Sequence, residues 1–528
     1  MGSRNSAGGV AVRLVLALCL SAVLITPATA LAAQVKNVIV LIVDGCSAEQ
    51  YTFARWYKGA PLSFDPHRVG SVKTYIADSV IADSAPAASA FATGVRTSDK
   101  HISVGPHRKT LTGVPVPPED LQYRPFATVL EGARLLGKAT GIVATSRVTH
   151  ATPGAYVAHT ASRSSEDDIM EQAVHQGLDV VMGGGRRHLL PRELKGARGD
   201  GENLYQTLRR WGYAVVENRQ DMLRISSGRV FGMFADNHMD PEIDRPALHP
   251  DQPTLAEMTR KAIELLAQDR DGFFLMVEGS QVDWACHAND VPHMLSDLLA
   301  YDQAVEAALD FARKDGRTLV LAVSDHNTGG FSIGNHNSNK IYPQMKVEDL
   351  LEPFRRMKVS GYQLWKALPE KTPEALRAAL REGWSLEITE AEARRIVALA
   401  PSYGENAYNA LGEVLCPIYT HVGWTTHGHC GGDVPLHAFG PGRPSGGVID
   451  APEIARICAH EKITARKTQE SRIRLQSRAL DTSANGICIV DAGESGMPFI
   501  YVNEAFCAIP GYAETEVLGR TCRSLRDA

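Results

Sequence analysis

The chain has 528 residues, of which 44% are hydrophobic, and a formal net charge of -5. This length is ample for one large domain with a sizeable core plus a smaller unit. The negative balance, without a basic stripe, argues against a nucleic-acid binding surface.

The first 33 residues have the layout of a secretory signal peptide. Arg4 and Arg13 precede an apolar run over 14–25, and small residues over 28–32 offer cleavage sites. A membrane anchor is the alternative, but the run is shorter than the roughly 20 residues needed to span a bilayer. We expect secretion or export to the periplasm, a mature chain beginning near Ala33, and no membrane span after removal of the signal.

The next segments alternate between strands and helices. Residues 35–43 form a near-continuous β-branched run, which is typical of a strand buried on both faces of a parallel sheet. Further strands are predicted over 138–145, 178–182, 272–277 and 318–323, and helices over 126–136, 254–268 and 292–314. This alternation predicts an α/β fold with a mainly parallel central sheet, in which ligands bind beyond the carboxyl ends of the strands.

A small-residue helix is predicted to begin at Ser84. Ser84 is a good N-cap, Pro86 is tolerated in a first helical turn, and Gly94 suits the C′ position. The serine oxygen would face unpaired N–H groups, which favour anions such as phosphate. Taken alone, this stretch is more often an ordinary capped helix.

Residues 331–421 differ in character, with polar helices predicted over 347–357, 372–382 and 389–400. We interpret this segment as an insertion that caps the site; the alternative is a set of ordinary peripheral helices.

Candidate metal ligands occur at the predicted strand ends. Asp283 and His287 are four residues apart and share one face of a helical turn, so both can reach one metal ion. Imidazole mixed with carboxylate suits zinc, and oxygen donors suit magnesium. The set is Asp44, Ser84, His150, Thr152, Glu278, Asp283, His287, Asp325, His326 and His429.

From 35 to 458 the chain resembles the alkaline phosphatases, and the resemblance rests on specific motifs in the family order. These are Val43-Asp44-Gly45, Asp83-Ser84-Ala85, His150-Ala151-Thr152-Pro153, Val277-Glu278-Gly279, Asp325-His326 and Gly428-His429-Cys430-Gly431. The resemblance implies a three-layer α/β sandwich, two Zn²⁺ and one Mg²⁺. It also implies that the enzyme acts on small-molecule phosphate monoesters, and it suggests a homodimer.

The resemblance also implies a role for each site residue. Ser84 would be the nucleophile that becomes phosphorylated, and Arg163 would clamp the phosphate, oriented by Asp83. One zinc would be held by Asp44, Ser84, Asp325 and His326, and the other by Asp283, His287 and His429. Magnesium would be held by Asp44, Thr152 and Glu278.

Several positions depart from the family pattern. His150 stands where some members carry an acid, which could shift the third site from magnesium towards zinc. Asn327-Thr328 lacks a second histidine found in some members, and Cys430 replaces a threonine. The nine cysteines show no CxxC pair, so no zinc knuckle or disulfide scaffold is indicated. For Cys430 and Cys46 a buried small residue is favoured over the alternative role of a zinc ligand, and we assign no ligand role to His421 or His427.

Related enzyme classes are distinguished by two features. Sulfatases carry C/S-x-P-x-R, whereas Ala88 stands at the arginine position here. Arg163 favours monoesters over diesters, whose second ester group leaves less charge to clamp. Phosphomonoesterase is therefore preferred to phosphodiesterase.

The C-terminal part changes composition. Residues 461–480 are predicted to form a linker helix, and 481–528 resemble the first half of a PAS domain of the flavin-binding type, with Cys522 nearest to the adduct cysteine. About half of the module's sheet would be missing, so we expect a truncated α+β fragment. The alternative function is a sensor or signalling protein whose phosphatase-like part is only a ligand-binding head.

Overall fold

The computed structural model describes residues 35–107 and 109–459, together with 488–490, 499–502, 517 and 520. The chain divides into two compact units, 1–459 and 460–528. The expected signal peptide and linker helix lie outside the described residues. In the second unit, β15 (Cys488–Val490) pairs antiparallel with β16 (Phe499–Val502).

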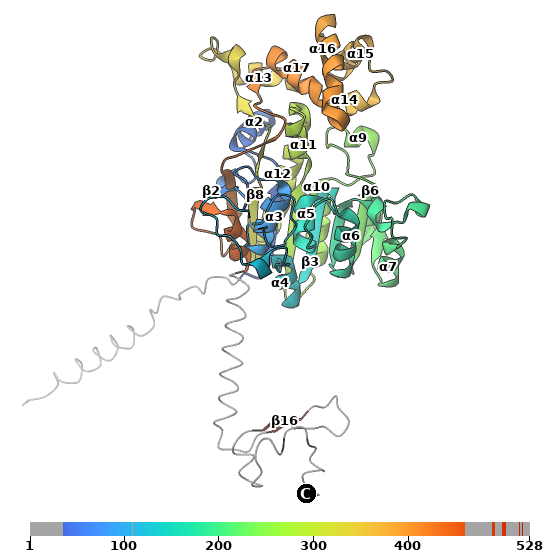
Figure 1. Cartoon of the computed structure of the whole chain (residues 1–528), viewed down its shortest axis with the longest axis vertical. Coiled ribbons are helices and arrows are strands. Elements are labelled where there is room, and N and C mark those ends of the chain that lie inside the picture. Colours follow the sequence, from blue (N-terminus) through green and yellow to red (C-terminus); the bar gives the residue numbers. More distant parts are fainter. Residues whose placement is uncertain are drawn as a thin grey trace, which may run out of the picture. The chain divides into compact units, whose positions relative to one another are not determined.

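The first unit is built on a ten-stranded sheet (Figure 1). β1 (Asn37–Val43) lies near its centre, with parallel neighbours on both sides. In spatial order the strands are β14 (Gly447–Asp450), β2 (Arg68–Lys73), β13 (Val434–Phe439), β8 (Thr318–Ser324), β1, β7 (Phe273–Gly279), β3 (Ala139–Arg147), β4 (Val180–Gly184), β6 (Val230–Ala235) and β5 (Ala214–Val216). Within this described sheet, β13 alone runs antiparallel to its neighbours. The predicted mainly parallel sheet is confirmed.

Side chains of β1 alternate between two hydrophobic cores. Ile39 and Leu41 face a core shared with helices α2 (Ala48–Lys58), α10 (Leu255–Leu266) and α12 (Val291–Asp315). Val38 and Val40 face a second core shared with α3 (Ser84–Thr93), α4 (Val129–Leu135), α5 (Ala151–Val157) and α6 (Glu166–His175). Burial on both faces explains why the strand is apolar throughout, and it confirms a three-layer arrangement.

The start of α3 corrects one prediction. The N-cap is Asp83 rather than Ser84, and Ser84 is the first helical residue. Asp83 makes no side-chain capping bond; its Oδ1 accepts from Arg163, and its Oδ2 has no hydrogen-bond partner. Gly94 ends the helix in the left-handed conformation, with φ of 75°, as predicted.

A group of helices lies together at one end of the unit (Figure 1). Most of them share a hydrophobic core of their own, which includes Leu380 and Leu411, whereas the first of these helices packs Leu350, Leu351 and Phe354 into the core that Ile39 and Leu41 face. The chain enters and leaves this region through an antiparallel pair, β10 (Ser332–Ile333) with β11 (Val422–Gly423). The elements are α13 (Val347–Arg355), α14 (Gly361–Ala367), α15 (Pro373–Trp384), α16 (Glu390–Leu399), the 3-10 segment η6 (Ala400–Asn406) and α17 (Asn409–Tyr419). Within the described part of the chain, no helix is both long and apolar enough to cross a bilayer.

Candidate metal centre

The order of strands brings the predicted ligands together. β8, β1, β7 and β3 are parallel neighbours, so their carboxyl ends meet at one edge of the sheet. Asp325 follows β8, Asp44 follows β1 and Glu278 lies near the end of β7. His150 caps the N-terminus of α5, which follows β3. The chain therefore concentrates charge at one edge.

The first group contains Asp44, Asp325 and His326, whose ligand atoms lie within 4.8 Å of one another. His326 Nε2 is 3.3 Å from Asp44 Oδ1 and 3.6 Å from Asp325 Oδ2. Buried Ser84 joins this group, because its Oγ lies 3.1 Å from His326 Nε2 and 3.5 Å from Asp44 Oδ1. The predicted nucleophile thus lies against a candidate metal site.

The second group contains Asp283, His287 and His429. Asp283 and His287 lie on α11 (Gln281–His287), and His429 is reached through β12 (His429–Cys430), which pairs with β9 (Asn327–Thr328) beside His326. His287 Nε2 is 3.2 Å from Asp283 Oδ2 and 3.1 Å from His429 Nε2. The Nδ1–H of His429 donates to the Ala82 carbonyl at 2.8 Å, and that of His287 to the His427 carbonyl. A carbonyl can only accept, so Nδ1 carries the proton in each neutral ring and Nε2 can offer its lone pair to a metal ion.

The third group contains Asp44, His150 and Glu278, with Thr152 on the first turn of α5. Four buried polar atoms here have no hydrogen-bond partner: Asp44 Oδ2, Glu278 Oε1, Thr152 Oγ1 and His150 Nδ1. Glu278 Oε2, in contrast, accepts from Ser146 and Ser280. Buried polar atoms are costly when unpaired, and a divalent cation would satisfy the oxygens.

The pKa shifts of the buried carboxyl groups also fit a metal site. Burial raises the pKa of Glu278 to about 7. Burial, and next the Asp283 charge, raise the pKa of Asp325 to about 7. The pKa of Asp44 is raised well above its usual value by burial and then by the charges of Asp325, Asp283 and Glu278. Although burial opposes it, the His287 ring holds the pKa of Asp283 well below its usual range. Metal cations would stabilise the ionised carboxylates.

Gly45 lets the first and second metal groups lie close together. Its φ of 70° is in the left-handed region, and a Cβ there would lie 2.8 Å from Asp283 Cα. Its N–H donates to Asp325 Oδ1 at 3.2 Å. Only glycine lets β1 turn this close to α11.

Arg163 extends from the loop after α5 to the same site. Its Nη1 donates to Asp83 Oδ1 at 2.6 Å, as predicted, and its Nη2 lies 3.0 Å from His150 Nε2. Although burial raises it, the guanidinium holds the pKa of Asp83 below its usual value. The cation is thereby fixed at the start of α3, beside Ser84.

Some of the surroundings are not predicted from the sequence. The Trp284 ring lies 5.4 Å from that of His150 and 4.1 Å from that of His238. No motif marks His238, which comes from the loop after β6, so the sequence offers no signal for it. In the described part of the chain, neither Cys46 nor Cys430 belongs to a candidate metal group, and both are free thiols.

Comparisons with known proteins agree with this arrangement. The sequence model of the family "Alkaline phosphatase" matches residues 35–462, and a PAS domain model matches 474–528. Alkaline phosphatase 3 of Bacillus subtilis (strain 168) is 36% identical over 441 residues, covering 80% of this chain and 88% of the relative. The repressible alkaline phosphatase of Saccharomyces cerevisiae is 32% identical over 451 residues, covering 76% of each chain.

Solved structures show the same fold. Thermus thermophilus alkaline phosphatase superposes with a TM-score of 0.70 at 28% identity, covering 81% of this chain and 91% of that one. The cold-active enzyme of Shewanella sp. gives 0.66 at 27% identity, covering 80% and 98%. A histidine-to-aspartate mutant of the alkaline phosphatase from the Antarctic bacterium TAB5, with Mg bound in its M3 site, gives 0.58 at 26% identity, covering 81% and 98%.

Proposed function

The chain belongs to the alkaline phosphatase family, and we propose that it hydrolyses phosphate monoesters through a phosphoserine formed on Ser84. The observation that carries this proposal is the position of Ser84 Oγ, 3.1 Å from His326 Nε2 and 3.5 Å from Asp44 Oδ1. The serine oxygen is thus placed beside candidate metal ligands, with the positive end of α3 adjacent.

Two zinc ions and one magnesium ion are the proposed cofactors. The first and second groups combine imidazole with carboxylate, which suits zinc, whereas the third offers mostly oxygen donors. When bound, a zinc pair would stabilise the attacking and leaving oxygens of an in-line displacement and supply a nucleophilic water.

The chain's own residues would bind the substrate and exchange the ester. Arg163, fixed by Asp83, would hold nonbridging phosphate oxygens in its planar fork. Ser84 Oγ would give its proton to solvent and bond to phosphorus as the P–O ester bond breaks, and the leaving alcohol oxygen would take the electron pair of that bond and a proton from solvent. Water then displaces Ser84 from phosphorus, releasing inorganic phosphate and restoring the hydroxyl.

His150 has two competing roles within this proposal. Burial, and next the Arg163 charge, lower the pKa of His150 to about 3, so its ring is neutral and has one lone pair. That lone pair can accept from Arg163 or bind the third cation, but not both. We therefore assign the cation at this site mainly to Asp44, Glu278 and Thr152.

The remaining assignments concern the whole chain. We propose residues 34–460 as the phosphatase domain, with the 331–421 segment as a cap over the site. The predicted signal peptide supports export of the protein, as a secreted or periplasmic enzyme that acts on small-molecule monoesters. The homodimer rests on the family resemblance alone. The PAS match at 474–528 favours the sensor alternative, and a flavin absorbance spectrum of the purified full chain tests it: no bound chromophore would leave that alternative without support.

The test compares three substrates on the full chain loaded with zinc and magnesium: an aryl phosphate, an aryl phosphodiester and an aryl sulfate, each with and without chelator. Fast monoester cleavage that the chelator abolishes is the expected result. Faster cleavage of the diester or sulfate would contradict the role of Arg163, and no turnover of any substrate would contradict the proposed function.

A further inference from the structure

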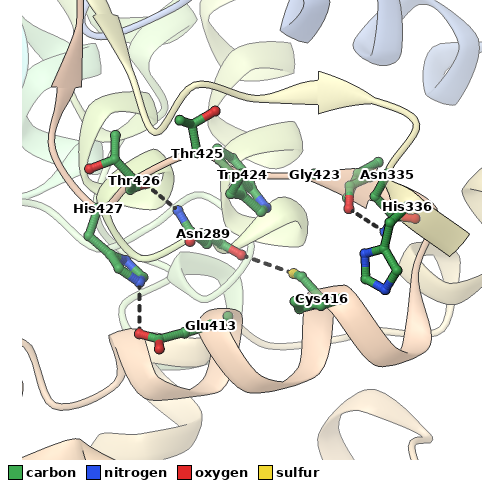
Figure 2. A pocket seen from close by; sticks show the side chains of 13 residues that line it. Asn289, Asn335, His336, Glu413, Cys416, Gly423, Trp424, Thr425, Thr426 and His427 are labelled. Carbon is green, nitrogen blue, oxygen red and sulfur yellow. Dashed lines mark hydrogen bonds and ion pairs between the residues drawn. The ribbon is translucent and has the colours of Figure 1, made fainter.

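A cavity of about 380 Å³ is lined by His427 (Figure 2), which comes two residues before the candidate ligand His429. One wall is the segment that leads to His429, and another is α17 of the helical region. His427 and Glu413 lie next to each other at one side of it, joined by a dashed line, and Asn289 lies close to His427 (Figure 2). The cavity marks the place where the helical region approaches a metal ligand.

His427 and the candidate ligand His287 exchange hydrogen bonds. Nδ1–H of His287 donates to the His427 carbonyl at 2.5 Å, and Nδ1–H of His427 donates to the His287 carbonyl at 2.6 Å. Two reciprocal bonds fix both backbones and the plane of the His287 ring. Such partners of a ligating histidine orient the ring and raise its basicity.

The far side of His427 is tied to the helical region. Its Nε2 lies 3.5 Å from Glu413 Oε2 on α17, and the Tyr403 hydroxyl donates to the same carboxylate oxygen. The Tyr403 ring packs edge-on against His427, with centroids 5.0 Å apart. A contiguous path therefore runs from Tyr403 through Glu413 and His427 to His287.

A second connection reinforces the path. The Asn289 amide donates to the carbonyls of Cys286 and Thr426, at 2.9 and 3.1 Å. On α17, the Cys416 thiol donates to the Asn289 carbonyl at 3.4 Å. The end of α11, the segment before His429 and α17 are thus joined twice within a few residues.

We propose that His427 and Glu413 are positioning residues, which hold His287 in its metal-binding orientation and couple the helical region to the second metal group. This inference rests on the proposed function, which places a metal ion there. His427 is not itself a ligand, because one ring nitrogen faces a backbone carbonyl and the other faces Glu413.

Two pairs of variants test the proposal on the full-length protein. His427→Ala removes the bond that the His427 ring donates to the His287 carbonyl and the contact with Glu413, and keeps the His427 carbonyl that accepts from His287. His421→Ala is its matched control, because it removes a histidine from the same segment, at the start of β11, where the His421 carbonyl accepts from the Gly334 N–H. Tyr403→Phe removes one hydroxyl from the path. Tyr419→Phe is the control for that change, because the Tyr419 hydroxyl donates to Glu392 on α16, at 2.7 Å.

The readout is zinc affinity, measured by competition with a chelator, together with the unfolding temperature of the metal-free protein. We expect His427→Ala to weaken the binding of one zinc ion about tenfold or more, and Tyr403→Phe to weaken it less but measurably. The zinc affinity of both control variants should stay within about twofold of that of the unmodified protein. This is well below the tenfold or larger loss expected when a hydrogen-bond partner of a metal ligand is removed.

Each result of these measurements supports or overturns the proposal. Equal zinc affinity in His427→Ala and His421→Ala, with only the unfolding temperature lowered, would show a purely structural tie and overturn the proposal. If His427→Ala does not fold, Tyr403→Phe decides, and equality with Tyr419→Phe overturns the proposal. Failure of the unmodified protein to retain two zinc ions would instead contradict the proposed function.

Discussion

Adding one methyl group at Gly45 should dismantle the second metal group. In Gly45→Ala the new Cβ would lie 2.5 Å from Asp283 Oδ1 and 2.8 Å from Asp283 Cα, too close for any pair of heavy atoms. The nearer contact is with a candidate metal ligand and the other with helix backbone. The strain is therefore relieved only if Asp283 moves, and its carboxylate moves with it.

The magnitude follows from a matched glycine. Gly59 has the same φ of 70°, and a Cβ added there would meet no atom within 4 Å. Gly59→Ala therefore carries the left-handed backbone penalty alone, about 1–2 kcal/mol. Gly45→Ala adds overpacking of about 1–3 kcal/mol, so its total loss of unfolding free energy is about 2–5 kcal/mol by these two contributions.

Two assays separate strain from loss of the site. Denaturant unfolding with chelator present compares the metal-free stability of both variants, and elemental analysis of the loaded proteins gives zinc per chain. We expect Gly59→Ala to keep its zinc, and Gly45→Ala to lose one zinc equivalent and turn over about 10²-fold more slowly, the cost of a misplacement of about 1 Å. Full zinc content with unchanged turnover in Gly45→Ala would refute the reasoning.

Two further substitutions test the binding of phosphate by Arg163 and the pH dependence of the hydrogen bonds to Glu131. Arg163→Ala should lower kcat/KM for an aryl phosphate about 10²–10³-fold, with a smaller loss for a phosphodiester; equal losses would contradict the clamp. Glu131 has its pKa lowered to about 2 by hydrogen bonds from His159, the Thr128 N–H and Gln176, although burial opposes this. Its contribution is present above the usual carboxyl pKa and lost as pH falls towards 2, so Glu131→Gln should cost about 2 kcal/mol above pH about 5 and nothing near pH about 2. A pH-independent difference in denaturant unfolding would contradict that linkage.

The edge of the sheet that carries the site could be predicted from sequence, because the direction of the parallel strands fixes where their carboxyl ends lie. Once 35–43 and 318–323 are recognised as buried parallel strands, Asp44 and Asp325 must emerge at the same edge. The boundaries agree closely, since β1 and β8 are Asn37–Val43 and Thr318–Ser324. The division of the ligands into groups depends on the family resemblance rather than on spacing.

What sequence could not give are contacts between distant segments. The three-residue β5 and the glycine-interrupted β6 carry too little alternation to be recognised. The exchange of bonds between His287 and His427 joins residues 140 positions apart. The sequence predicts the N-cap of α3 one residue late because Asp and Ser are equally good caps. Asp83 holds the N-cap position by its extended backbone, with φ of -101° and ψ of 155°, and not by a side-chain capping bond.

The most direct test of the central claim is chemical capture of the intermediate on Ser84. The zinc- and magnesium-loaded full chain is mixed with an aryl phosphate, quenched in acid and digested, and the peptides are analysed by mass spectrometry. One added phosphoryl group is expected on Ser84, and none anywhere in Ser84→Ala, whose turnover should collapse. A phosphorylated intermediate at another residue, with substantial turnover in Ser84→Ala, would contradict the assignment of Ser84 as the nucleophile.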